Sequence, residues 1–137
     1  MGEVLMNGFK PEKLSHLYEN LWIEGLAVYV SYVMNPDATN KQILMSDTLV
    51  QDATPMIPKL SEELLSKLDS TSLADVQRYF WMQTDSKDIP TRTAYFVGLL
   101  VVKHVARRHS LAEMVRLSGP DLRNEVAKAL EEMSMSQ

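Results

Sequence analysis

The sequence predicts an all-α protein that folds as a single domain. Apolar residues recur at steps of three and four over long stretches, which is the spacing of one face of a helix. Apolar and polar residues do not alternate over more than a few positions, so strands are not expected. The 137 residues are the size of one domain and can bury an adequate core. We therefore expect six to seven helices, without internal repeats.

The first helix is expected over residues 11–34, after a loose arm at residues 1–10. Pro11 suits the first turn of a helix, where its missing N–H is not needed. Asn35 and Pro36 end the helix, because the residue before a proline avoids the helical conformation. Its apolar face is wide, which places the helix at the centre of the fold. The face comprises Leu14, Leu17, Tyr18, Leu21, Trp22, Gly25, Leu26, Tyr29 and Val33.

Shorter helices are expected in the middle of the chain. Asn40 can cap a helix over about residues 41–51, and a leucine stripe from 60 to 68 indicates the next one. Ser72 is the expected N-cap of a third helix, which continues through Trp81.

The second strongly apolar helix is expected over residues 91–109, after a polar loop at 84–90. Gly98 lies near its middle, where a glycine costs roughly 1 kcal/mol relative to alanine. We attribute this glycine to the close approach of another backbone. The helices at 11–34 and 91–109 are therefore expected to form the core pair.

Two further helices are expected near the C-terminus. Residues 110–113 have the pattern of a capping box, which begins a helix. Residues 118–121, Ser-Gly-Pro-Asp, end that helix and begin the last one. The helical domain should thus span residues 11–133, with a frayed tail at 134–137.

The composition excludes several classes of function. A net charge of −4 argues against non-specific binding of nucleic acid, which requires a basic face. The absence of cysteine excludes disulfides, thiolate metal sites and a cysteine nucleophile. No segment reaches the roughly 18 apolar residues that cross a bilayer, and the first residues lack the pattern of a signal peptide. We expect a soluble chain without a membrane partner, in a compartment that the sequence leaves open.

Glu24 is the residue that most strongly suggests chemistry. It lies in the nearly all-apolar stretch 21–31, where a buried carboxylate costs several kcal/mol unless a cation or hydrogen-bond donors meet it. One interpretation is an exposed or hydrogen-bonded carboxylate at the edge of a helix. The other is a metal ligand or an acid–base group. A zinc site would require ligands from elsewhere, because one carboxylate cannot hold zinc.

Arg92 and Tyr95 form a second candidate site at the start of the second apolar helix. A guanidinium and a phenolic hydroxyl three residues apart could stabilise a developing oxyanion. The alternative is a core tyrosine beside a surface arginine.

The histidines and methionines favour structural roles. His16 to Asn20 reads H-x-x-E-N, one ligand short of the inverted zinc motif H-x-x-E-H, and polar residues at a solvated helix start are the simpler interpretation. His104 and His109 lie beside basic residues, which disfavours cation binding. The nine methionines indicate core filling, with an adaptable apolar partner surface as the alternative.

Two segments resemble predicted zinc-dependent peptidases of the gluzincin type. The first is 22–31, with E-G-L-A at 24–27, followed by Met-Asn-Pro at 34–36. The second comprises 95–98, Tyr-Phe-Val-Gly, and 106–113, Ala-Arg-Arg-His-Ser-Leu-Ala-Glu, and the resemblance covers roughly residues 17–133.

In such families an H-E-x-x-H helix supplies two histidine ligands and the general base, and a downstream E-G-L-A helix supplies a glutamate as third ligand. The resemblance implies that Glu24 is the third zinc ligand, with Tyr95 and Arg92 near the oxyanion.

The H-E-x-x-H helix is absent from this sequence. The chain is therefore expected to be the C-terminal part of a longer peptidase or a relative that has lost catalysis, and to be inactive alone. Zinc is expected only when the H-E-x-x-H helix is present, and none is expected to bind tightly to this chain. The expected partners are the missing N-terminal half, an apolar protein partner or a second copy of the chain. The alternative function is a non-catalytic helical module that binds a protein or an apolar ligand through a methionine- and aromatic-lined groove.

Overall fold

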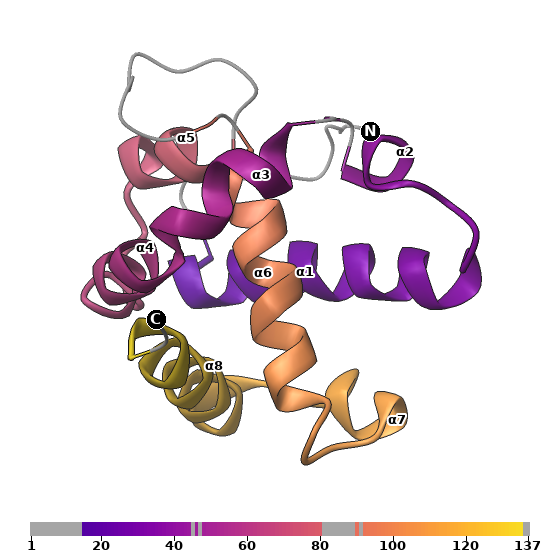
Figure 1. Ribbon diagram of the computed structural model, residues 1–137. Coiled ribbons are helices and arrows are strands. Elements are labelled where there is room, and N and C mark those ends of the chain that lie inside the picture. Colours follow the sequence, from indigo (N-terminus) through magenta and orange to yellow (C-terminus); the bar gives the residue numbers. More distant parts are fainter. Residues whose placement is uncertain (1–14, 45, 47, 81–89, 91, 136–137) are drawn as a thin grey trace, which may run out of the picture.

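The fold is that of a computed structural model, which describes residues 15–44, 46, 48–80, 90 and 92–135. All the regular structure in these residues is helical (Figure 1). Helix α3, the 3-10 turn η2 and helix α4 follow one another without a break and form one bent arm. Counted with this arm as one helix, the described residues contain seven helices. The prediction of an all-α single domain is confirmed. The elements are α1 (Leu17–Met34), α2 (Asn40–Leu44), α3 (Leu49–Ala53), the 3-10 turn η2 (Thr54–Met56), α4 (Ile57–Leu65), α5 (Leu73–Phe80), α6 (Thr93–Val105), α7 (Leu111–Met114) and α8 (Gly119–Ser134).

Helices α1 and α6 cross at the centre of the molecule (Figure 1). They share the most extensive contact between any two elements of the described residues, which confirms the predicted core pair. Helix α8 packs mainly against α4 and also contacts both α6 and α1. The fully buried side chains come from nearly every element. The largest of them are Tyr79, Leu17, Leu21, Leu44, Leu49, Leu60, Leu64, Met114, Leu130 and Met133.

Two glycines lie where α1 and α6 cross. A Cβ atom added to Gly98 would lie 2.7 Å from the carbonyl oxygen of Leu21 and 3.0 Å from the Cα of Gly25. A Cβ added to Gly25 would lie 2.8 Å from the Cα of Gly98. The two backbones are therefore in direct contact, which confirms the reason given above for a glycine in the middle of an apolar helix.

The start of α1 differs from the prediction. The helix begins at Leu17 and not near residue 11, because His16 has an extended backbone. The N–H of His16 donates to the carboxylate of Glu19 over 2.9 Å, which caps the first turn. The expected arm at 1–10 and Pro11 lie outside the described residues.

The predicted helix at 41–51 is wrong in extent, because two caps divide this segment. The hydroxyl of Thr39 accepts the N–H of Gln42 over 3.2 Å, and the Gln42 side chain accepts the N–H of Thr39 over 2.8 Å. Thr39 therefore caps α2, and the predicted cap Asn40 is already its first residue. The hydroxyl of Ser46 accepts the N–H of the first residue of α3 over 3.0 Å and begins the second helix.

The second core helix is shorter than predicted. Helix α6 ends at Val105, and residues 106–109 form a turn. The predicted capping box is confirmed: the Ser110 hydroxyl accepts the N–H of Glu113 over 3.1 Å, and the Glu113 carboxylate accepts the N–H of Ser110 over 2.8 Å.

The last two boundaries to compare with the prediction are the C-terminal ends of α8 and α5. Helix α8 continues through Ser134, so the tail begins later than predicted. Helix α5 ends at Phe80; Trp81 and most of the predicted loop at 84–90 lie outside the described residues. No helix in the described ranges is both long enough and apolar enough to span a bilayer.

Candidate functional site

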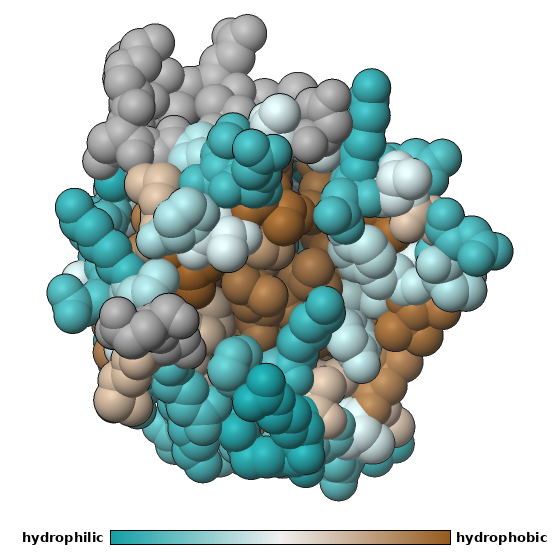
Figure 2. All heavy atoms as spheres, viewed as in Figure 1, coloured by the Kyte–Doolittle hydropathy of each residue, from teal (hydrophilic) through white to brown (hydrophobic). Residues whose placement is uncertain are grey.

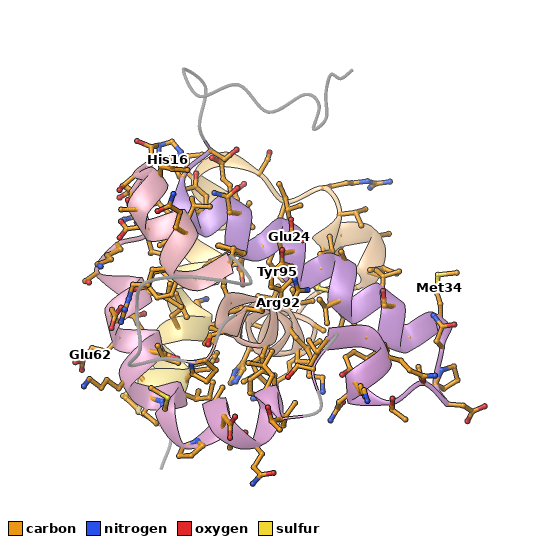
Figure 3. All side chains as sticks on the ribbon, turned by 90° about the horizontal axis from the view of Figure 1, so that it is seen from above. His16, Glu24, Met34, Glu62, Arg92 and Tyr95 are labelled. Carbon is orange, nitrogen blue, oxygen red and sulfur yellow. The ribbon has the colours of Figure 1, made fainter. Side chains whose placement is uncertain are left out.

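Glu24, Arg92 and Tyr95 come together beside the crossing of α1 and α6 (Figure 3). Glu24 precedes Gly25 on α1, Tyr95 lies one turn before Gly98 on α6, and Arg92 is the N-cap residue immediately before α6. Because the two glycines bring the helices into backbone contact, the side chains next to the crossing share one space. The structure thus unites three residues that the sequence selected in two separate segments.

Arg92 and Tyr95 form a packed pair. The Cζ atom of Arg92 lies 4.1 Å from the centroid of the Tyr95 ring, which is a cation–π geometry. The Tyr95 ring in turn meets Phe80 edge to face, with the centroids 5.7 Å apart. Both Arg92 and Tyr95 are partly buried, so neither is simply a core tyrosine or a surface arginine.

The backbone of Arg92 is strained. Its φ angle is +63°, in the left-handed region that costs a residue with a side chain about 1–2 kcal/mol. Its Nε atom is buried and has no hydrogen-bond partner among the described residues. Strained backbones and unpaired buried donors cluster at functional sites, so Arg92 is marked by two independent features.

The strain at Arg92 gives a prediction. Arg92→Gly and Arg92→Ala remove the same guanidinium, but only glycine adopts a positive φ without cost. We expect Arg92→Gly to be more stable than Arg92→Ala by about 1 kcal/mol, measured by urea unfolding. The same pair of substitutions at the exposed, helical Glu131 should show the reverse order, because alanine favours a helix. Equal stability of the two Arg92 variants would contradict the strain.

The carboxylate of Glu24 is half-buried. Burial raises the pKa of Glu24, and the positive charge of Arg92 lowers it by less, so the net shift is upward. Within the described part of the chain, this carboxylate has no partner at hydrogen-bonding or ion-pairing distance. Glu24 therefore does not extend freely into solvent, and Arg92 is the positive group that acts on it.

Tyr95 keeps its proton at neutral pH. Burial raises the pKa of Tyr95, the negative charge of Glu24 raises it further, and Arg92 acts in the opposite direction. A neutral tyrosine hydroxyl can donate a hydrogen bond to a ligand at this site.

Glu24 fits one position of a metal site and no more. Among the residues that the structure describes, no three histidine, aspartate or glutamate side chains converge on one point. A half-buried carboxylate without a bonding partner suits a ligand position, but zinc requires three protein ligands and a water, or four protein ligands. The remaining ligands would have to come from outside the described residues.

The histidines lie away from this site, in pairs with other carboxylates. His16 stacks on Tyr18 and lies 3.0 Å from the Glu19 carboxylate at the start of α1. The Nδ1 of His104 lies 3.1 Å from Glu132 of α8.

His109 also pairs with α8. Its Nε2 lies 3.3 Å from Glu125, and Arg108 bonds the same glutamate over 2.9 Å. These contacts fasten the C-terminal end of α6 to α8.

A hollow that was not predicted from the sequence lies between α6, α8 and the arm formed by α3, η2 and α4. Its lining includes Phe96, Leu100 and His104 of α6, at steps of four residues. That spacing was the signal in the sequence. The hollow could not be predicted from this spacing alone, because its other walls come from segments far away in the chain.

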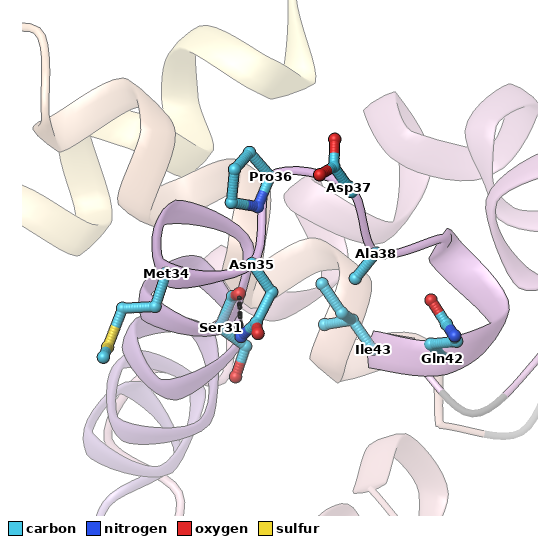
Figure 4. A pocket seen from close by; sticks show the side chains of 8 residues that line it. All are labelled: Ser31, Met34, Asn35, Pro36, Asp37, Ala38, Gln42 and Ile43. Atoms are coloured by element: carbon cyan, nitrogen blue, oxygen red, sulfur yellow. Dashed lines mark hydrogen bonds between the residues drawn. The ribbon is translucent and has the colours of Figure 1, made fainter.

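A second hollow lies between the end of α1 and α2 (Figure 4). It is open, and its main polar group is already used: the Asn35 amide donates to the carbonyl oxygen of Ser31 over 2.9 Å and caps the last turn of α1. Its residues therefore have a structural role at the end of a helix.

Comparison with known proteins finds no matching family model, no matching curated protein and no matching solved structure.

Proposed function

We propose that this chain is the helical C-terminal part of a protein related to zinc-dependent peptidases, in which Glu24 is the third zinc ligand. The observation that carries this proposal is the meeting of Glu24, Arg92 and Tyr95, from the two core helices, at one partly buried site. The resemblance of residues 22–31, 34–36, 95–98 and 106–113 to such peptidases implies the same three residues at one site.

The electrostatics of Glu24 support the proposal. A half-buried carboxylate that lacks a bonding partner destabilises a domain unless a positive group completes its surroundings. Arg92 does so only in part, since the pKa of Glu24 remains raised. A zinc ion bound here would supply Lewis-acid chemistry.

The other two residues have distinct roles in this proposal. Tyr95, neutral at physiological pH, would donate a hydrogen bond to the oxygen of a peptide carbonyl as negative charge develops on it. Arg92 holds the Tyr95 ring by its cation–π contact and contributes positive charge to the same space. Among the described residues no further ligands converge with Glu24, so in this proposal the two histidine ligands and the general base come from an H-E-x-x-H helix.

Glu24→Gln tests whether the Glu24 carboxylate is an uncompensated charge that a bound cation would neutralise. In the isolated chain at pH 7 we expect the free energy of unfolding to stay the same or to rise, because an uncompensated charge is removed. Glu62→Gln, at an exposed position of α4, is the matched control and should change stability by less than about 0.5 kcal/mol. A loss above about 2 kcal/mol for Glu24→Gln would identify half of a structural ion pair and contradict the proposal.

The effect of Glu24→Gln should depend on pH. Because the pKa of Glu24 is raised in the folded state, the folded protein binds a proton that the unfolded chain releases. The destabilisation by the charged carboxylate is complete above the folded-state pKa and disappears as the pH falls to the ordinary value of 4.5. Any advantage of the glutamine variant should shrink over that range. The difference between the two proteins isolates Glu24 over this acidic range, because Tyr95, the group whose pKa Glu24 raises, stays protonated there in both.

Zinc binding tests the function itself. The isolated chain should show no sub-micromolar zinc site by calorimetry, and such a site would contradict the proposal. Together with an H-E-x-x-H segment encoded upstream in the same gene, it should bind zinc. There Glu24→Gln should weaken binding by more than the roughly 10–100-fold loss that is typical of outer-shell partners. An upstream sequence without H-E-x-x-H would leave the helical binding module as the better function.

A further inference from the structure

The hollow between α6, α8 and the α3–α4 arm has the size and lining of a small-molecule site. Its apolar walls include Ile57, Phe96 and Met133, each less than a tenth exposed, together with Leu100. Its volume of about 410 Å³ lies within the range of roughly 300–1,000 Å³ that is usual for ligand pockets. Figure 2 shows apolar side chains gathered in the middle of this face, with hydrophilic ones around them.

His104 provides the polar group of the hollow. Its Nδ1 lies 3.1 Å from a carboxylate oxygen of Glu132, and its side chain is 17% exposed. A carboxylate accepts hydrogen bonds, so Nδ1 donates to Glu132, and in the neutral form of the ring Nε2 presents a lone pair. No described residue lies at hydrogen-bonding distance from Nε2. The hollow thus combines an apolar body with one oriented acceptor.

The surrounding charge selects the head group of a ligand. Glu132 is an anion beside His104 that disfavours a carboxylate or a phosphate at the same place, although Arg108 lies 3.8 Å from its other carboxylate oxygen and offsets part of this charge. The hydroxyl of Thr54, at the edge of the hollow, already donates to the carbonyl oxygen of Val50. The unsatisfied group is therefore an acceptor beside a carboxylate whose charge Arg108 partly offsets, which suits a neutral donor.

We propose that this hollow binds a small, neutral, largely apolar molecule with one hydroxyl group, that is, a phenol or an apolar alcohol. The hydroxyl donates to Nε2 of His104, and the hydrocarbon part contacts Phe96, Leu100, Ile57 and Met133. This hollow does not involve Glu24, Arg92 or Tyr95, so the proposal of a ligand here can be tested independently of the proposed zinc site.

Three probes of one shape test the head group on the full chain. We expect 2-naphthol to bind saturably, about three- to tenfold more tightly than naphthalene, as one neutral hydrogen bond allows. The anionic 2-naphthoate should bind more weakly than 2-naphthol. Carbon-13 NMR should place the largest shifts on the methyl groups of Ile57, Leu100 and Met133. No saturation by 2-naphthol at millimolar protein, or shifts centred elsewhere, would overturn the proposal, and tighter binding of 2-naphthoate would overturn the neutral head group.

Two variants test the location. Leu100→Trp should fill the hollow and abolish binding, whereas Leu111→Trp, at an exposed position of α7, should leave it unchanged. His104→Phe should remove the preference for 2-naphthol over naphthalene while naphthalene still binds. Binding of 2-naphthol that is unaffected by Leu100→Trp in a folded protein would contradict the site. If Leu100→Trp does not fold, the location of the site is tested by the methyl shifts that 2-naphthol causes in the natural chain.

Discussion

An alanine at position 25 is expected to lower the free energy of unfolding by about 3 kcal/mol or more. Its Cβ would lie 2.8 Å from the Cα of Gly98 and closer still to the Gly98 carbonyl group. These are backbone atoms of a buried helix, which cannot rotate away as the end of a side chain can. Without this contact, an alanine in a helix interior would stabilise the protein by about 1 kcal/mol over glycine. The loss therefore measures the closeness of the crossing, and urea unfolding would show it.

Gly119→Ala is the control for this prediction. An added Cβ at Gly119 meets no atom within 4 Å, but the φ angle there is +58°. Only the backbone strain of about 1–2 kcal/mol should appear. If Gly25→Ala cost no more than Gly119→Ala, the backbones of α1 and α6 would not be in contact as described.

Glu63→Ala is expected to cost about 2–3 kcal/mol, because it breaks a partly buried polar cluster between α4 and α5. The carboxylate of Glu63 accepts a hydrogen bond from Arg78 Nε over 2.9 Å and another from the hydroxyl of the fully buried Tyr79. Its removal leaves the buried Tyr79 hydroxyl without this acceptor. The neighbouring Glu62→Ala, at an exposed position, should change stability by less than about 0.5 kcal/mol. Similar losses for both variants would contradict the role of Glu63.

The contribution of Glu63 should also depend on pH, in the direction opposite to that of Glu24. Burial alone would raise the pKa of Glu63, but the hydrogen bonds from Arg78 and Tyr79 outweigh it and lower the pKa. The stabilisation by Glu63 is thus complete above the unfolded-state pKa and is lost as the pH falls through the folded-state pKa. The difference in unfolding free energy between the natural chain and Glu63→Ala should therefore decrease in acid.

The long helices could be predicted from the sequence, as could the capping box of the short helix α7, whereas the division between α2 and α3 could not. Two wide apolar stripes identified the core pair, and the cost of Gly98 pointed to a close crossing. The starts of α1, α2 and α3 depend on hydrogen bonds that the side chains of Glu19, Thr39 and Ser46 accept from backbone N–H groups, and neighbouring side chains are equally suitable acceptors. Apolar periodicity carries no information about which cap forms.

The residues of the candidate site could be selected from the sequence, but their meeting could not be derived from it. Glu24 stood out as a charge in an apolar stretch, and Arg92 and Tyr95 as polar groups at the start of a helix. That they share one space depends on where α1 crosses α6, which the contact of Gly25 with Gly98 determines. The left-handed backbone of Arg92 could not be predicted from its residue type, because glycine or asparagine would be expected at such a position.

The direct contact between the backbones of α1 and α6 fixes the distance between these two helices next to the candidate site. Main-chain atoms of Gly25 and Gly98 act as a fixed pivot, so main-chain contact sets the spacing of the α1 and α6 backbones beside Glu24 and Tyr95, while the Tyr95 ring also packs against Phe80. Exchanges of one apolar residue for another elsewhere in the core would weaken the fold before they moved these two side chains apart. The interior can therefore vary while the geometry beside the pivot stays constant.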